Sequence, residues 1–296
     1  MSDLLHGWLV IDKPVGLGST PVVSAVKRAL REAGLAKHKV GHGGTLDPLA
    51  SGVLPIALGE ATKLAGRMLD ATKAYDFTIR FGEETSTLDA EGETVSTSDL
   101  RPSLAEVQAI LPRFTGAIEQ VPPAYSALKI DGKRAYDLAR AGQEVALRSR
   151  QVTIFDLTVV EATPDQLTLS ATVSKGTYIR SLARDIAHAV GTVGHVTMLR
   201  RTKAGPFTLA QAISLDFLSE TAKARRLDGA VLPLVAGLDD IPALPVSPEE
   251  AVLLRQGRQL PRSPAHRGLY LATDAGRPVA LVEVTDVLRV VRGFNL

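Results

Sequence analysis

Alternating hydrophobic and polar residues predict several β-strands along the chain. The apolar run at residues 7–12 is short and ends at a Lys-Pro pair, as expected for a buried strand. Strict alternation at residues 75–81 predicts a strand with one buried face. Two more alternating runs, at residues 152–160 and 167–173, predict antiparallel neighbours, and another strand begins at Gly194.

Apolar residues at helical spacing predict helices between these strands. A Thr-Pro pair at residues 20–21 supplies an N-cap and a first-turn proline for a helix that ends at Gly34. A capping box at residues 103–106 predicts a second helix, which runs toward Leu111. The clearest helical pattern covers residues 179–190, where one face is apolar throughout.

A further strand and helix are predicted between the alternating runs at residues 75–81 and 152–160. Residues 125–130 predict a strand that turns at residues 131–132 into a helix containing Ala135, Leu138 and Ala139.

The C-terminal part is set apart by a Pro-rich stretch at residues 241–248, the best candidate for a linker. A short helix at residues 248–256 and three strand-like runs follow it, which predicts a small β-rich domain. In the rest of the chain, hairpins mix with helices. This favours an α+β fold with a mixed, largely antiparallel sheet over a doubly wound parallel sheet.

The composition is that of an ordinary packed protein. The 296 residues are 45% hydrophobic and 22% charged, which excludes collagen-like, coiled-coil and disordered chains. The net charge of +2 is too small to indicate a polyanion partner by itself. The absence of Cys excludes a disulfide scaffold, a thiol nucleophile and thiolate metal sites. Without a long apolar run or a basic leader, we expect a cytoplasmic protein that makes no membrane contact.

The most unusual segment is the Gly-rich sequence GHGGTLDP at residues 41–48. One interpretation makes Asp47 the N-cap of a helix that starts at Pro48 and stops at Gly52. The other uses the same geometry for function, because backbone N–H groups at a helix N-terminus would hold the Asp47 carboxylate ionised and oriented as a nucleophile. The glycine spacing fits neither a dinucleotide-binding fingerprint nor a Walker loop.

Arg180 and Tyr75 each allow two interpretations. Thr177 as N-cap would place Arg180 in the first turn of its helix, where a cation opposes the helix dipole. Arg180 is therefore either solvated or the buried partner of an anion such as Asp47. Tyr75 begins the apolar side of its strand, which suits core packing, but its hydroxyl is not needed there.

Histidines and basic residues carry weaker signals. The 6 histidines show no metal-binding spacing, so we expect no metal site and interpret His42 as a loop residue. The basic run at residues 199–203 is by itself compatible with a solvated strand end.

Together, these segments resemble the TruB family of pseudouridine synthases, which isomerise uridine 55 in the T loop of tRNA. The resemblance is carried, in the family's order, by IDKPVGLGST, GHGGTLDPLASGVLPIALGEATK, KAYDFTIRFGEETSTLDAEG, PPAYSALKIDGKRAYDLARAG, SKGTYIRSLARDIA and GHVTMLRRTKAGPF. These stretches cover most of residues 8–210, so the match is far more specific than any single motif.

The resemblance implies roles for individual residues. Asp47 corresponds to the catalytic aspartate, Tyr75 to the ring that stacks on the target base, and Arg180 to the ion-pair partner of the aspartate. Lys13 and Pro14 correspond to residues that support the catalytic loop. The positions implied to contact the substrate are His42, Tyr178 and Leu199. The candidates for RNA contacts are Lys13, Lys129, Lys133, Arg200, Arg201 and Lys203.

The resemblance also implies domains and partners. We expect a pseudouridine synthase domain at residues 1–240, with an RNA-binding insertion at about 122–150, and a PUA-like domain at residues 246–296 that touches the acceptor arm. The expected partner is tRNA, bound through its T arm by a monomer and without a guide RNA. Because the isomerisation adds and removes nothing, no cofactor or metal is expected.

Alternative functions stay open at this point. A non-catalytic RNA-binding or tRNA-folding protein could use the same scaffold, although the joint presence of Asp47, Tyr75 and Arg180 argues against lost catalysis. A guide-RNA-dependent relative would carry a larger C-terminal domain. A metal hydrolase built on His42 and Asp47 lacks further ligands.

Overall fold

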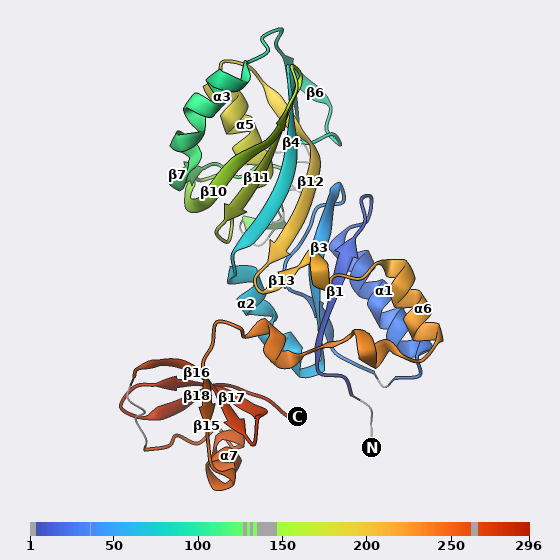
Figure 1. Cartoon of the computed structure of the whole chain (residues 1–296), viewed down its shortest axis with the longest axis vertical. Coiled ribbons are helices and arrows are strands. Elements are labelled where there is room, and N and C mark those ends of the chain that lie inside the picture. Colours follow the sequence, from blue (N-terminus) through green and yellow to red (C-terminus); the bar gives the residue numbers. More distant parts are fainter. Residues whose placement is uncertain (1–3, 36, 127–128, 131–132, 135–146, 262–265) are drawn as a thin grey trace.

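One mixed sheet forms the main body of the protein (Figure 1). The computed structural model describes residues 4–296 except 36, 127–128, 131–132, 135–146 and 262–265. Within the described residues, ten strands pair in the order β14-β1-β3-β12-β4-β11-β10-β7, with β2 beside β3 and β13 beside β12. Their pairs are antiparallel except that of β12 and β3, which is parallel. The predicted α+β class with a largely antiparallel sheet is confirmed.

The strands of this sheet are β1 (Gly7–Lys13), β2 (Val40–His42), β3 (Ala50–Leu58), β4 (Lys73–Phe81), β7 (Gly116–Gln120), β10 (Arg150–Ala162), β11 (Gln166–Val173), β12 (Gly194–Ala204), β13 (Phe207–Thr208) and β14 (Leu232–Pro233).

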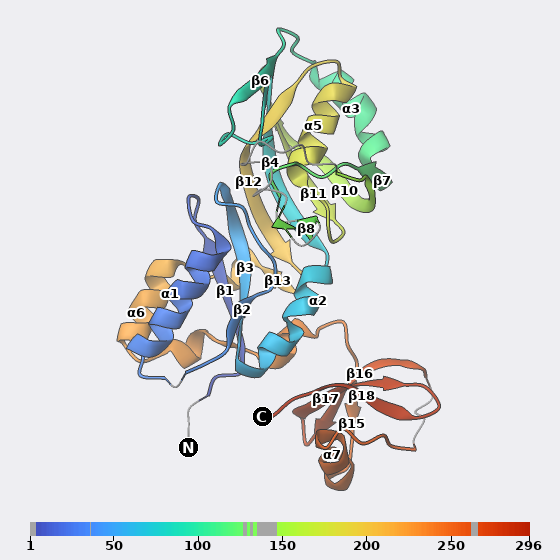
Figure 2. The same ribbon diagram turned by 180° about the vertical axis from the view of Figure 1, so that it is seen from behind.

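Helices cover the two halves of the sheet separately. Helices α3 (Leu104–Ile110) and α5 (Ile179–Ala189) lie on the half that contains β4, β10 and β11, where Phe77, Leu169 and Leu182 are fully buried (Figure 1). Helices α1 (Ser19–Glu32) and α6 (Leu215–Lys223) lie beside β1 and β3 (Figure 2). Helix α2 (Ala65–Asp70) follows β3. The 3₁₀ helices are Gly59–Leu64, Leu111–Phe114, Leu209–Gln211, Leu227–Ala230 and Leu234–Gly237.

Sequence patterns predicted most of these elements. The alternating runs are β4, β10 and β11, and β11 pairs antiparallel with both others. The capping box of Ser103 and Glu106 starts α3, as predicted. The predicted N-cap at Thr20 is wrong, because α1 begins at Ser19. The Ser19 hydroxyl instead accepts a hydrogen bond from the Leu46 N–H (2.8 Å) and so ties α1 to the loop before β3.

The C-terminal part forms a small β domain, as predicted. Its four-stranded sheet has the order β15-β16-β17-β18, and α7 packs against it. Part of the predicted linker is itself a strand, β15, which pairs parallel to β16. Its elements are β15 (Ala243–Pro245), α7 (Pro248–Arg255), β16 (Gly268–Asp274), β17 (Arg277–Val284) and β18 (Leu288–Gly293).

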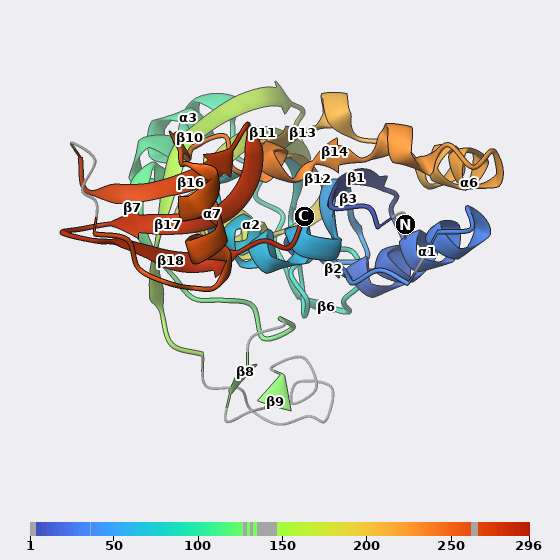
Figure 3. The ribbon, with the colours of Figure 1, turned by 90° about the horizontal axis from the view of Figure 1, so that it is seen from below.

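Two small hairpins leave the main sheet. Strands β5 (Glu83–Thr85) and β6 (Thr94–Thr97) form one, and β8 (Lys129–Ile130) and β9 (Lys133–Arg134) form the other, which lies away from the body in Figure 3. The strand expected at residues 125–130 is thus only β8. The turn and the helix expected after it lie outside the described residues, as do the side chains of Lys129 and Lys133.

Candidate active site

A pocket of about 560 Å³ opens where the two halves of the main sheet meet. Strand β12 joins these halves, because it pairs with β3 on one side and with β4 on the other. The wall combines the loop before β3, the start of β4, β12 and the turn into α5. Of the site residues that the family resemblance implied, those lining the pocket are Asp47, Tyr75, Tyr178, Arg180, Leu199 and Arg201.

Asp47 lies in a turn and not at the N-terminus of a helix. The Ala50 N–H donates to the Asp47 carbonyl oxygen (3.1 Å), and β3 begins at Ala50. The predicted helix is therefore wrong. The segment instead becomes a strand that pairs with β1 and β12, and these ladders satisfy its backbone more completely than a short helix would. The side chain of Asp47 is 41% exposed, so its carboxylate faces the pocket without being sealed from it.

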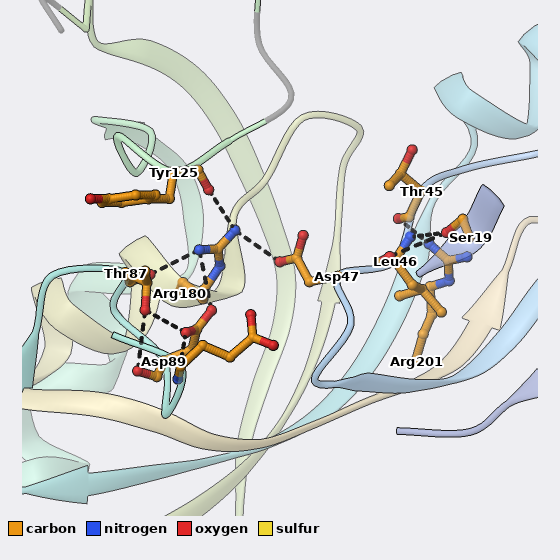
Figure 4. A network of polar contacts seen from close by, with 10 residues as sticks. Ser19, Thr45, Leu46, Asp47, Thr87, Asp89, Tyr125, Arg180 and Arg201 are labelled. Atoms are coloured by element: carbon orange, nitrogen blue, oxygen red, sulfur yellow. Dashed lines mark hydrogen bonds and ion pairs between the residues drawn. The ribbon is translucent and has the colours of Figure 1, made fainter. Parts of the chain in front are cut away.

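Arg180 is buried and holds the carboxylate of Asp47 (Figure 4). Its Nη2 lies 2.8 Å from Asp47 Oδ2, and its side chain is 7% exposed. Nη1 donates to the Thr87 carbonyl oxygen (2.8 Å) and Nη2 to the Tyr125 carbonyl oxygen (3.0 Å). Of the two interpretations drawn from the sequence, the structure shows the buried ion pair with Asp47.

A second carboxylate, which sequence analysis missed, binds the same guanidinium. Asp89 Oδ2 lies 3.3 Å from Arg180 Nη1, and the Asp89 side chain is 7% exposed. Its Oδ1 accepts hydrogen bonds from the Glu91 N–H (3.1 Å) and the Thr87 hydroxyl. The buried Asp89 carboxylate thus compensates the buried guanidinium, and the more exposed Asp47 adds a second negative charge at the pocket. The only local signal was the acidic turn Asp-Ala-Glu-Gly after β5, which does not reveal its distant partner.

Lys13 supports the Asp47 loop from within the protein. It is 0% exposed, and its Nζ donates to the carbonyl oxygens of Pro14 (2.9 Å), Pro48 (3.3 Å) and Leu17. Burial lowers the pKa of Lys13 to about 8, although the nearby Asp47 carboxylate acts in the opposite direction. The predicted RNA contact of Lys13 is wrong because no phosphate can reach a fully buried ammonium, whereas the implied support of the loop matches these contacts.

Arg201 holds the other side of the loop, as Figure 4 shows in part. It is 1% exposed, and its guanidinium donates to the carbonyl oxygens of Val53 (2.7 Å), Gly44 (3.2 Å) and Thr45 (3.3 Å). The prediction that Arg201 contacts RNA is therefore also wrong. Gly52 allows this close packing, because a Cβ there would stand 2.1 Å from the Arg201 carbonyl oxygen and its φ is +101°.

The remaining basic candidates of this strand differ in exposure. Arg200 Nη2 pairs with Asp12 Oδ2 (2.8 Å), and both side chains are about one-third exposed. Lys203 is exposed. Their contacts with RNA stay predictions.

Tyr75 and Leu199 give the pocket an apolar side. Both are half-buried and pack against the apolar clusters on either side of β12. Tyr75 stands on β4 between Ala171 of β11 and Arg201 of β12. Its ring therefore borders the pocket while the rest of the residue is fixed in the sheet.

Tyr178, the residue before α5, is fixed by a side chain from the edge of the sheet. Gln120 is fully buried, its Oε1 accepts from the Tyr178 N–H (2.8 Å), and its Nε2 donates to the Tyr178 carbonyl oxygen (3.1 Å). The predicted N-cap at Thr177 is wrong, because its hydroxyl donates to the Ser174 carbonyl oxygen (3.0 Å) instead. Arg180 nevertheless lies in the first turn, as predicted.

His42 lies on β2 and is not among the described residues that line the pocket. Its Nδ1 is buried and has no hydrogen-bond partner among the described residues. Burial, reinforced by the nearby Arg201 guanidinium, lowers the pKa of His42 below its ordinary value. The imidazole is therefore neutral at physiological pH, and a substrate contact for His42 stays a prediction.

In the described part of the chain, no three His, Cys, Asp or Glu residues are grouped so that they could hold a metal ion. The helices described there are too short or too polar to cross a membrane.

Comparison with known proteins identifies the family. Residues 27–179 match the sequence model of the TruB family pseudouridylate synthase N-terminal domain, and residues 180–239 match the tRNA pseudouridylate synthase B C-terminal domain. Curated relatives named tRNA pseudouridine synthase B include that of Novosphingobium aromaticivorans, 61% identical over 99% of this chain and 98% of the relative. The relative from Zymomonas mobilis is 60% identical over 99% of this chain and 97% of the relative.

Solved structures agree with this assignment at the level of the fold. A chain in the crystal structure of a Cbf5-Nop10-Gar1 complex superposes with a TM-score of 0.74 and 26% identity, over 98% of this chain and 85% of that chain. A chain in an H/ACA RNP bound to a substrate RNA containing 2'-deoxyuridine gives a TM-score of 0.74 at 24% identity, over 98% and 86% of the two chains. The sequence matches establish that the chain belongs to the TruB family of pseudouridylate synthases.

Proposed function

We propose that this chain isomerises uridine 55 in the T loop of tRNA to pseudouridine, with Asp47 as the catalytic carboxylate. The observation that carries the proposal is the ion pair of Asp47 with the buried Arg180 at a pocket bordered by Tyr75, in a chain of this family. Relatives with about the same length are named tRNA pseudouridine synthase B, which supports tRNA as the substrate.

The reaction needs one oriented anion beside the ribose. The C1′–N1 bond of the uridine breaks, the uracil turns, and C5 bonds to C1′ while the C5 proton is lost and N1 gains a proton. Asp47 has two possible first steps, attack on C1′ or removal of the C2′ proton to give a glycal. Both require a fixed carboxylate anion, and the charge-assisted contact with Arg180 orients it.

The apolar side of the pocket suits the detached base. Tyr75 can stack on the uracil while it turns, and Leu199 excludes water that would hydrolyse the detached sugar. A uridine within a folded loop must first be flipped out, at a cost of a few kcal/mol. The phenol of Tyr75 is the candidate acceptor of the C5 proton, directly or through a water molecule.

The test is pseudouridine mapping on an unmodified tRNA transcript incubated with the purified protein and a chelator. We expect modification at position 55 by the wild-type chain and none by Asp47→Asn, which keeps the side-chain shape but removes the charge. Because the carboxylate faces the reacting sugar and not the bulk of the RNA, Asp47→Asn should still bind tRNA. The exposed Asp99 provides the control variant Asp99→Asn, which should retain full activity.

The same experiment separates this function from its alternatives. Full turnover by Asp47→Asn would refute the mechanism, and tRNA binding without modification by the wild type would favour the non-catalytic RNA-binding or tRNA-folding protein. We further propose that the chain acts as a cytoplasmic monomer without a guide RNA, and that its C-terminal domain is PUA-like and touches the acceptor arm. Activity on the transcript alone tests whether a guide RNA is needed. Comparison of whole tRNA with an isolated T arm tests the contact with the acceptor arm.

A further inference from the structure

Four cations line the active-site pocket within the described residues, and they differ in how their donors are used. Lys73 Nζ donates to the carbonyl oxygens of Leu69 (2.5 Å) and Ala71 (2.6 Å). Arg180 and Arg201 are occupied by the carboxylates and carbonyl oxygens described above. The fourth cation, Arg150, donates through Nη2 to the Gly176 carbonyl oxygen, its Nη1 has no partner among the described residues, and its Nε is buried.

Arg150 is nevertheless held in one place. It is the first residue of β10 and pairs in register with Gln120, the residue that fixes the backbone of Tyr178. Its guanidinium carbon lies 4.6 Å from the centre of the Tyr178 ring, a cation–π contact. Gly176, at a φ of +80°, turns the chain so that its carbonyl oxygen meets Arg150.

A second hollow, of about 680 Å³, adjoins the pocket. The two share Leu69, Arg150, Ser174 and Gly176 as lining residues. Arg150 thus stands at the junction between the space beside Asp47 and a neighbouring space large enough for another nucleotide.

RNA bound with one sugar at Asp47 must leave the pocket through its phosphodiester links, one on each side of that sugar. A guanidinium presents paired N–H donors that match two phosphate oxygens, and among the described residues Nη1 of Arg150 has no protein partner, while Nη2 is bound only by the Gly176 carbonyl oxygen. We propose that Arg150 binds a phosphodiester adjoining the target uridine and that the neighbouring hollow takes the next nucleotide. This inference rests on the proposed function.

The test pairs a protein variant with a change of one phosphate. The substrates are short T-arm hairpins, either unmodified or with a neutral methylphosphonate on the 5′ or the 3′ side of the target uridine. The variants are Arg150→Gln and, as a matched control, Arg148→Gln, which removes an equal charge from an exposed neighbour on the same segment. The measured quantity is kcat/KM for pseudouridine formation, with thermal unfolding as the check on folding.

We expect the wild type to lose about tenfold in kcat/KM at one of the two neutral linkages, as for the loss of a hydrogen bond to a charged group. On the unmodified hairpin, kcat/KM of Arg150→Gln should be lower by a similar factor. The neutral linkage to which the wild type is sensitive should not lower it further. The tRNA affinity of Arg150→Gln should fall less steeply with salt, by about one unit of the logarithmic slope. Arg148→Gln should behave as the wild type does toward both linkages.

The proposal would be overturned if each neutral linkage lowered kcat/KM of Arg150→Gln by the same factor as in the wild type. It would also be overturned if Arg150→Gln and Arg148→Gln lost equal factors in kcat/KM. If Arg150→Gln does not fold, Arg150→Lys, which keeps the charge without the paired donors, carries the same comparison. Absence of pseudouridine with the wild type would refute the proposed function itself. Wild-type activity without coupling between Arg150 and a phosphate would refute only this inference.

Discussion

At the scale of single residues, buried cations position Asp47, the one carboxylate among the described residues that lines the pocket. Arg180 contacts Asp47 directly, whereas Lys13 and Arg201 bind carbonyl oxygens of the loop that carries it. Asp89 completes this arrangement, because it supplies a second negative charge to Arg180 and leaves Asp47 free to face the substrate.

Arg180→Lys should lower kcat by about a hundredfold, since an ammonium cannot reach both carboxylates and both carbonyl oxygens that the guanidinium contacts, and a small misplacement has effects of that size. Single-turnover kinetics with saturating enzyme would measure the chemical step apart from binding. The control Arg184→Lys changes another arginine of α5, one that pairs with Asp185 away from the pocket. A rate near that of the wild type would exclude the positioning role of Arg180.

The lowered pKa of Lys13 predicts a pH dependence of stability. The pKa is about 8 in the folded protein against the ordinary 10.5, so the unfolded chain binds more protons between these values. The free energy of unfolding contributed by Lys13 therefore rises with pH, by about 2 kcal/mol from about pH 7.5 to about pH 9.5. Urea unfolding of the wild type and of Lys13→Met at both pH values would isolate it. An equal difference between the two proteins at both pH values would contradict the expectation.

At the scale of elements, the site depends on contacts between segments that are distant in sequence. Strand β12 brings the Asp47 loop beside β4 through its pairing with β3, and the end of β7 fixes the start of α5 through Gln120. The Ser181 hydroxyl adds to this junction by donating to the Val121 carbonyl oxygen (2.8 Å). The first turn of α5, which carries Arg180, is thereby attached to the sheet.

Gln120→Leu should lower the free energy of unfolding by about 1–3 kcal/mol, because it leaves the backbone groups of Tyr178 without their partner. It should also lower kcat, since Tyr178 and Arg180 lose their shared support. Urea unfolding and steady-state kinetics on the T-arm hairpin would measure the two effects. Gln108→Leu, at an exposed position of α3, should change neither, and equal effects of both substitutions would argue against the role of Gln120.

Local patterns predicted the elements well and the loop geometry poorly. Alternation and capping residues act over a few neighbours, so β4, β10, β11 and α3 could be predicted from them. The turn at Asp47 could not, because the pairing of β3 with β1 and β12 outweighs the helix preference of an Asp-Pro pair.

The family resemblance assigned Asp47 and Arg180 to one ion pair, which single-chain patterns left open. Asp89 was missed because a contact with a residue distant in the sequence leaves no periodic pattern among the neighbouring residues. Lys13 and Arg201 were misjudged as RNA contacts because burial of a charged residue depends on carbonyl oxygens supplied by other segments.

At the scale of the whole molecule, the C-terminal domain is packed against the catalytic part and is not merely tethered to it. Leu271, Leu281 and Phe294 share one apolar cluster with Trp8 of β1. Polar contacts border this cluster, such as that of Lys63 Nζ with the Gly293 carbonyl oxygen (2.9 Å). The position of the domain relative to the pocket is thus set by core-like packing.

Phe294→Ala should lower the free energy of unfolding by about 3–5 kcal/mol, the usual effect of removing a buried aromatic ring. Leu296→Ala, two residues further on and 54% exposed, should change it by less than about 0.5 kcal/mol. Chemical denaturation followed by circular dichroism would measure both. Similar stabilities of the two variants would mean that the interface contributes little.

Lys13 and Arg201 donate hydrogen bonds to main-chain carbonyl oxygens of the Asp47 loop, and this has a consequence for sequence variation. Carbonyl groups are common to all amino acids, so these contacts do not depend on which side chain stands at an exposed loop position such as Thr45. Thr45 can therefore be substituted in evolution or by engineering, whereas Lys13 and Arg201, which bind the backbone, cannot. Libraries that randomise Thr45 alone should yield active enzymes far more often than libraries that vary Lys13 or Arg201.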